Sequence, residues 1–69
     1  MVEPNSAGTL IKKARQRKRM TQVQLATALG VTKSSVANWE RGFHYPLRTA
    51  GAIEELLDIT LPEPAEAAS

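Results

Sequence analysis

The 69-residue chain contains 42% hydrophobic residues, nine Lys and Arg against seven Asp and Glu, one His and no Cys. This length predicts one small domain near the lower limit for a buried core, and the lack of Cys excludes disulfides and thiolate metal sites. No apolar run is long enough for a secretory signal or a membrane span, so we expect a cytoplasmic protein. With a single His and no carboxylates gathered around it, we expect no metal and no other cofactor.

The charges are distributed unevenly along the chain. All nine Lys and Arg lie within residues 12–48, where Glu40 is the only acid, whereas residues 49–69 hold five acids and no base. The net charge is therefore +8 in the first segment and −5 in the second. This asymmetry indicates a chain that meets a polyanion with one face, and a simply solvated basic helix is the alternative.

The N-terminal part predicts a short lead-in and one basic helix. Residues 1–7 are polar, and we expect a flexible segment in which Asn5 or Ser6 caps the following helix. That helix is predicted over residues 8–19, where three apolar residues share a face: Leu10, Ile11 and Ala14. Six bases occupy the other positions: Lys12, Lys13, Arg15, Arg17, Lys18 and Arg19. Their charge suits phosphate contacts, and the last of them also suit the helix dipole.

Two short helical patterns follow, over residues 22–29 and 33–41. Thr21 begins a capping-box sequence for the first helix, and Thr32 suits the N-cap of the second. Gly30 lies between them, where a tight turn requires positive φ. Six apolar residues fall on the facing sides of the two helices: Leu25, Ala26, Leu29, Val31, Val36 and Trp39. The pattern predicts a helix-turn-helix, whose second helix enters the DNA major groove.

The outward face of that second helix carries candidate base-reading residues. Lys33 can donate to guanine, Asn38 can pair with adenine through two hydrogen bonds, and Ser34 is permissive. These residues are also ordinary for an exposed helix surface, which is the alternative interpretation. Trp39 could stack on bases, but its spacing from Val36 favours the core.

Glu40 is the lone acid in the basic segment, and Arg15 is its candidate partner. An ion pair between them would tie the first helix to the end of the third. If the pair is partly buried, removing one partner should cost a few kcal/mol.

A loop follows the third helix. Gly42 is expected to end that helix, and Pro46 at the end of the loop biases Tyr45 to an extended conformation. Phe43 and Tyr45 are compatible with a cover over the core, a phosphate contact or a contact with a second subunit. Arg48 lies just past the loop, where a DNA backbone contact is feasible.

The last predicted helix covers residues 48–58. Its apolar stripe contains Ala50, Ile53, Leu56 and Leu57. Gly51 within it costs up to about 1 kcal/mol in helix propensity, so we expect the helix to depend on tertiary packing. Ile59 and Leu61 should close the fold, and residues 62–69 read as a disordered acidic tail.

Across residues 8–61 the sequence resembles the Cro/phage-repressor-type helix-turn-helix family, also called the XRE family. The resemblance rests on Arg15, Met20-Thr21-Gln22, Leu25-Ala26, Leu29-Gly30-Val31, Val36, Trp39-Glu40-Arg41-Gly42 and Pro46. It implies an all-α, compact four- to five-helix bundle like that of lambda repressor. It also implies a homodimer bound to a palindromic operator in double-stranded DNA. The family's fifth helix is missing or reduced to residues 59–61, and Arg19 occupies a position where the family often has Gly.

The resemblance also implies roles for single residues. Lys33, Ser34 and Asn38 match the base-reading positions, and Gln22 matches a glutamine that contacts phosphate. Arg41 and the loop after Gly42 match further backbone contacts. Apart from the resemblance, DNA binding by this chain is expected to use Lys12, Arg17 and Arg48 for phosphate contacts as well. Arg15 and Glu40 match the family's structural ion pair.

The function predicted from the sequence is a DNA-binding transcription regulator, a repressor of phage or mobile-element type associated with the nucleoid. The alternative is an antitoxin-like or adaptor subunit that binds another protein through Phe43, Tyr45, Leu56 and Leu61. An enzyme is not expected, because the sequence shows no nucleophile–base pair, metal cluster or phosphate-binding glycine loop. We expect neither a membrane partner nor a small-molecule ligand.

Overall fold

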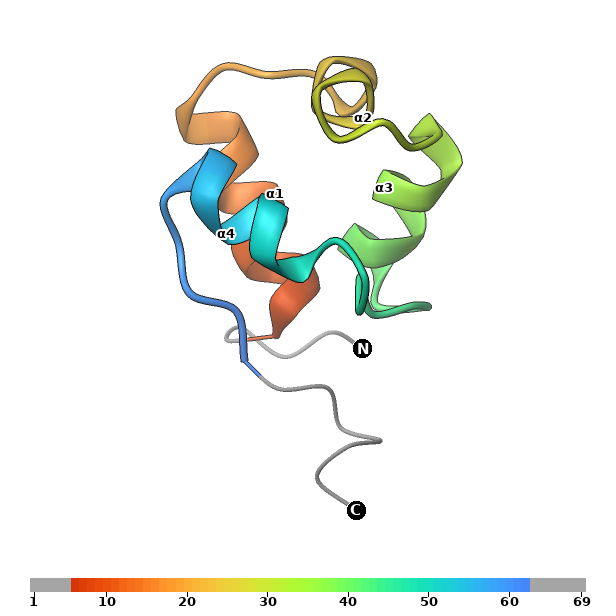
Figure 1. Ribbon diagram of the computed structural model, residues 1–69, viewed down its shortest axis with the longest axis vertical. Coiled ribbons are helices and arrows are strands. Elements are labelled where there is room, and N and C mark those ends of the chain that lie inside the picture. Colours follow the sequence, from red (N-terminus) through yellow and green to blue (C-terminus); the bar gives the residue numbers. More distant parts are fainter. Residues whose placement is uncertain (1–5, 63–69) are drawn as a thin grey trace.

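A computed structural model describes residues 6–62, which form four helices and contain no strand. The helices are α1 (Ala7–Arg17), α2 (Gln22–Leu29), α3 (Lys33–Arg41) and α4 (Ala50–Leu57) (Figure 1). The predicted all-α fold is therefore confirmed. The predictions of a lead-in and an acidic tail fall mainly on residues 1–5 and 63–69, which lie outside the described part of the chain.

Side-chain caps fix the starts of the first three helices. Ser6 caps α1, and the Thr21 hydroxyl accepts a hydrogen bond from the Gln24 backbone N–H at 3.0 Å. The Gln24 side chain returns the bond by accepting from the Thr21 backbone N–H at 2.8 Å, which completes the predicted capping box. At α3 the Thr32 hydroxyl accepts from the Ser35 backbone N–H at 3.1 Å. These caps satisfy backbone donors that the first helical turn leaves unpaired.

A residue with positive φ follows each of the four helices, as the C-cap of α2, α3 and α4 and in the turn after α1. Gly30 has φ 73° after α2 and Gly42 has φ 82° after α3, as predicted. Arg19 has φ 57° and Asp58 has φ 56°, although both carry a Cβ. The first basic helix consequently ends at Arg17 and not at residue 19 as predicted, because Arg19 turns the chain out of the helical conformation.

The core forms where α1 packs against α3 and α4, and where α2 packs against α3. Figure 1 shows α2 end-on while α3 runs across the view, so the two helices of the motif cross steeply. Among the described residues, the buried side chains that form this core are Ile11, Ala14, Leu25, Ala26, Val36, Trp39, Ile53, Leu57 and Leu61. Trp39 therefore belongs to the core, as its spacing predicted. Gly8 allows α1 to approach α3 closely, because a Cβ at Gly8 would lie 3.0 Å from the Glu40 carbonyl oxygen and closer still to that of Trp39.

The C-terminal part differs from the prediction in two respects, the start of α4 and the exposure of Leu56. Helix α4 begins at Ala50, two residues after the predicted start at residue 48. The reason is that residues 47–49 form a turn in which the Thr49 N–H donates to the Pro46 carbonyl at 3.1 Å. Leu56, which was predicted on the apolar stripe of α4, is 38% exposed. Residues 59–62 are not helical, so the described chain has no fifth helix. Leu61 nevertheless closes the core, as predicted.

Candidate nucleic-acid interface

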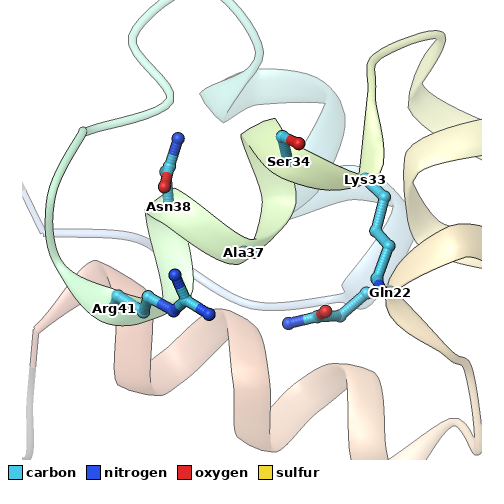
Figure 2. A pocket seen from close by; sticks show the side chains of 6 residues that line it. All are labelled: Gln22, Lys33, Ser34, Ala37, Asn38 and Arg41. Atoms are coloured by element: carbon cyan, nitrogen blue, oxygen red, sulfur yellow. The ribbon is translucent and has the colours of Figure 1, made fainter.

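One face of α3 and the start of α2 form a depression of about 250 Å³. It is lined by Gln22, Lys33, Ser34, Ala37, Asn38 and Arg41 (Figure 2). The five residues from α3 are spaced at i, i+1, i+4, i+5 and i+8, which places them on one side of a helix. The structure thus brings the three predicted base-reading residues together with two of the predicted backbone contacts.

The opposite side of α3 is held in the protein. Val36 and Trp39 are buried in the core, and the Glu40 carboxylate is buried beside α1. The helix is further fixed by the Thr32 cap at its start and by Gly42 at its end. Because the inner side is anchored at several points, the outer side is presented as a rigid surface, which is what recognition of base edges requires.

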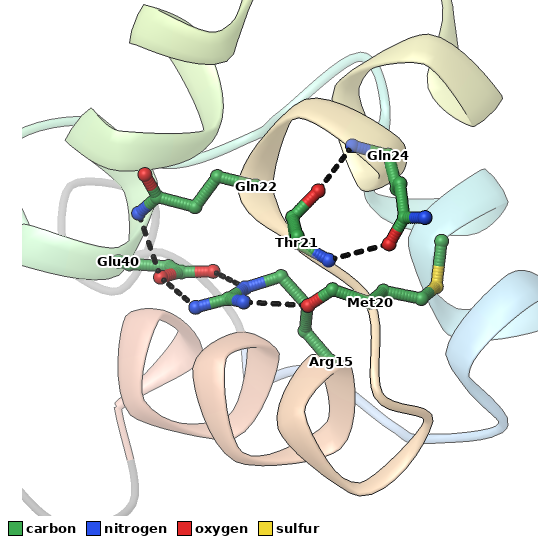
Figure 3. A network of polar contacts seen from close by, with 6 residues as sticks. All are labelled: Arg15, Met20, Thr21, Gln22, Gln24 and Glu40. Atoms are coloured by element: carbon green, nitrogen blue, oxygen red, sulfur yellow. Dashed lines mark hydrogen bonds and ion pairs between the residues drawn. The ribbon is translucent and has the colours of Figure 1, made fainter.

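The buried anchor is the ion pair predicted from the sequence (Figure 3). Arg15 Nε donates to Glu40 Oε2 at 2.7 Å, and Arg15 Nη2 donates to Glu40 Oε1 at 3.1 Å. The two side chains are only 11% and 4% exposed. Arg15 Nη1 also donates to the Met20 carbonyl at 2.7 Å, which ties the chain before α2 to α1. Among the described residues no buried side-chain nitrogen or oxygen lacks a hydrogen-bond partner.

Gln22 has a contact that the sequence did not predict. Its Nε2 donates to Glu40 Oε1 at 3.1 Å, so the ion pair and the depression share this residue (Figure 3). The two residues are 18 positions apart. A capping threonine followed by Gln indicates the start of a helix, but no local pattern identifies the carboxylate that the Gln amide reaches.

The other predicted backbone contacts lie outside the depression. Lys12, Arg17 and Arg48 are exposed, and Arg48 belongs to the turn before α4. Arg17 follows Arg15 by two residues, which rotates it by about 200° around α1 and directs it away from α3. It lines a separate groove of about 510 Å³ together with Leu10, Lys13, Gln16 and Ile59. The structure therefore does not bring Arg17 to the α3 face.

The loop after α3 carries exposed apolar side chains. Phe43 is 67% exposed and Leu47 is 71% exposed. The Tyr45 hydroxyl donates to the Pro62 carbonyl at 2.5 Å, which ties this loop to the segment after α4. Leu61 is buried in the core, so the surface predicted for the protein-binding alternative is wrong with respect to this residue.

Residues 6–62 contain neither a cluster of metal-ligating side chains nor a helix that could span a membrane. No group of three or more His, Asp or Glu side chains is placed to hold a metal ion. None of the described helices has the length and apolar character needed to cross a membrane.

Two capped helices that cross at a left-handed glycine, the second with one side buried and a polar outer side, define a helix-turn-helix domain. The chain belongs to the Cro/C1-type (XRE) helix-turn-helix family, a family of DNA-binding proteins: the family model described as "Helix-turn-helix" matches residues 11–63. No curated protein matches the chain.

One similar solved structure is described as "Crystal Structure of Apo-HppE". It matches with a TM-score of 0.70 and 30% sequence identity over 86% of the present chain and 34% of the other chain. The present chain thus spans about a third of the length of that chain, and the likeness concerns the helical fold.

Proposed function

We propose that the protein is a sequence-specific double-stranded DNA-binding transcription regulator that represses by occupying an operator. The observation that carries the proposal is the gathering of Lys33, Ser34 and Asn38 on the outer side of α3, whose inner side is fixed in the core. In a helix-turn-helix protein, this helix lies in the major groove and its N-terminal residues meet the base edges.

The three side chains offer different chemistry to the major groove. The Lys33 ammonium donates to guanine O6 and N7, and the Asn38 amide both donates to and accepts from adenine. The Ser34 hydroxyl donates or accepts, and the methyl group of Ala37 suits contact with a thymine methyl. We assign base reading to Lys33, Ser34 and Asn38 on these grounds.

The DNA backbone would be held by residues around the reading face. Gln22 and Arg41 line the same depression and are suited to the phosphates that flank the groove. Lys12 precedes Arg15 by three residues and so lies on nearly the same side of α1, which directs it toward α3. Arg48 is exposed in the turn before α4 and completes the proposed set. Arg17 lies on another side of α1, at the groove that it lines with Lys13 and Ile59, and its phosphate contact stays a prediction.

Two copies of the domain on a palindromic operator would place their recognition helices about 34–36 Å apart. The family resemblance supports this homodimeric arrangement and a place on the nucleoid in the cytoplasm. Exposed Phe43 and Leu47 favour one other candidate function, a module that docks onto a second protein, in which DNA plays no part.

The proposal is tested by binding of the full chain to duplex DNA selected from a random pool. Lys33→Ala should weaken binding and relax the preference at one base pair by roughly 1–3 kcal/mol. Lys13→Ala is the matched control, because Lys13 is an equally exposed lysine that lines the groove on the far side of α1. An unchanged ratio of operator affinity to random-DNA affinity in Lys33→Ala would overturn the base-reading assignment.

A salt titration separates DNA binding from the alternative. Contacts with several phosphates make the logarithm of the affinity fall linearly with the logarithm of the salt concentration. Arg41→Ala should reduce that slope, whereas a protein that does not use DNA would show no saturable binding to titrate.

A further inference from the structure

The carboxylate of Glu40 makes one more contact than an ion pair requires. Besides the two bonds from Arg15, its Oε1 accepts a bond from Gln22 Nε2 at 3.1 Å. The Glu40 side chain is 4% exposed, whereas Gln22 is half-buried and lines the depression on the outer side of α3. Gln22 is therefore the physical link between a buried charge and the proposed DNA surface.

The contact determines which way the Gln22 amide points. An ionised carboxylate only accepts hydrogen bonds, so Gln22 must turn its NH₂ group toward Glu40. Its carbonyl oxygen then points away from Glu40, as Figure 3 shows. One amide N–H also stays available for an acceptor on DNA. An isolated Gln amide would instead populate both orientations, because its terminal torsion is broad and roughly two-fold.

We propose that Glu40 is a positioning residue for DNA binding, which acts by holding the Gln22 amide in one orientation before DNA arrives. The proposal rests on the proposed function and deepens it, because it adds a role for a buried residue that does not contact DNA. Arg15 has an indirect part: its two bonds hold the Glu40 carboxylate in place.

The proposal predicts how DNA affinity responds when the carboxylate becomes an amide. In Glu40→Gln one oxygen is replaced by an NH₂ group, and Arg15 Nε, which makes the shorter of the two Arg15 bonds at 2.7 Å, keeps the remaining oxygen in the Oε2 position. The new NH₂ group then faces the NH₂ group of Gln22, so the Gln22 amide turns over or becomes free. Ordering a side chain on binding typically costs enough to weaken affinity about three- to tenfold.

A double-mutant cycle separates positioning from a merely structural role. Affinity for a selected DNA site is measured with wild type, Glu40→Gln, Gln22→Ala and the double variant, at a temperature where circular dichroism shows each to be folded. The proposal expects Glu40→Gln to weaken binding about three- to tenfold in the wild-type background and less than twofold in the Gln22→Ala background. An equal loss in both backgrounds would overturn it.

A matched control and a spectroscopic readout accompany the cycle. Glu54→Gln is the control, because Glu54 also accepts a structural bond, from the Leu61 N–H at 2.7 Å, but lies on α4. It should leave DNA affinity unchanged. In NMR spectra of the free wild-type protein, the chemical shifts of the Gln22 side-chain NH₂ group should differ from those of a solvent-exposed Gln amide. In Glu40→Gln they should move to the values of a solvent-exposed amide.

The remaining outcomes also decide the question. If Glu40→Gln does not fold, Gln22→Ala decides the question, because this variant keeps both Arg15–Glu40 bonds. The proposal requires Gln22→Ala to weaken DNA binding at least threefold. Unchanged affinity overturns the proposal. If wild type binds no DNA, the proposed function fails together with this inference. If wild type binds and the cycle shows no coupling, only the inference fails.

Discussion

Gly8 and Gly51 provide a test of packing in which the same substitution should have opposite effects. Each is the second residue of its helix, α1 and α4 respectively, so Ala at either position gains a similar intrinsic propensity of up to about 1 kcal/mol. The surroundings differ. A Cβ at Gly51 would meet no atom within 4 Å, whereas a Cβ at Gly8 would meet the carbonyl oxygens of Trp39 and Glu40 in α3, the latter at 3.0 Å.

The magnitudes follow from these contacts. Gly51→Ala should stabilise the fold by about 0.5–1 kcal/mol, because nothing opposes the gain in propensity. Gly8→Ala must push α1 away from backbone atoms of α3 that cannot rotate aside. Overpacking against backbone this close costs up to about 3 kcal/mol, so after the propensity gain of up to about 1 kcal/mol we expect a net loss of about 1–2 kcal/mol.

Thermal unfolding followed by circular dichroism measures both effects. For a domain of this size each kcal/mol corresponds to a shift of about 4–8 °C in Tm. Gly51→Ala should therefore raise Tm by roughly 2–8 °C, and Gly8→Ala should lower it by at least about 4 °C. If Gly8→Ala raised Tm as Gly51→Ala is expected to do, the close approach of α1 to α3 would be refuted.

Three further substitutions test the caps, the turn and the ion pair by urea unfolding. Arg19→Gly should raise the midpoint by relieving a left-handed residue, a gain of about 1 kcal/mol, and a lower midpoint would contradict the positive φ at this position. Thr32→Ala removes the cap of α3 and should cost about 0.5–2 kcal/mol; no change would mean that the cap contributes nothing. Glu40→Ala leaves Arg15 buried without its partner and should cost about 3–5 kcal/mol, enough to unfold much of so small a domain. A cost below about 1 kcal/mol would show that water reaches this pair freely.

Local chemistry explains why most of the motif could be predicted from the sequence. The caps at Thr21 and Thr32 and the turn at Gly30 depend on residues within three or four positions of one another. The ion pair between Arg15 and Glu40 could be predicted for a different reason. A single acidic residue in a basic segment is best explained by an ion pair with one of the bases around it.

The errors arose where tertiary packing or an unusual backbone conformation decides. The periodicity of α4 places Leu56 beside buried residues, but periodicity does not indicate how far the neighbouring helices extend, and its side chain is 38% exposed. The helical repeat likewise places Lys12 and Arg17 on different sides of α1, which basic composition does not indicate, and the phosphate contact of Arg17 stays a prediction. The positive φ of Arg19 was not predictable from its residue type, because residues other than glycine seldom adopt it.

Contacts across the fold were the least predictable part of the candidate site. The approach of Gly8 to α3 depends on a helix crossing that no local pattern describes. The bond from Gln22 to Glu40 joins residues 18 positions apart, and a Gln in this position has several possible acceptors until the helices are placed. The proposed positioning role of Glu40 accordingly comes from the structure alone.

The central claim is that the outer side of α3 reads the sequence of double-stranded DNA. The most direct test is selection of bound sites from a random duplex pool by the full chain, with Lys33→Ala selected in parallel. We predict that wild type enriches one short motif, arranged as a palindrome if two copies bind, and that Lys33→Ala loses the preference at one base pair of each half-site. No enrichment by wild type, or an identical motif with both proteins, would contradict the account.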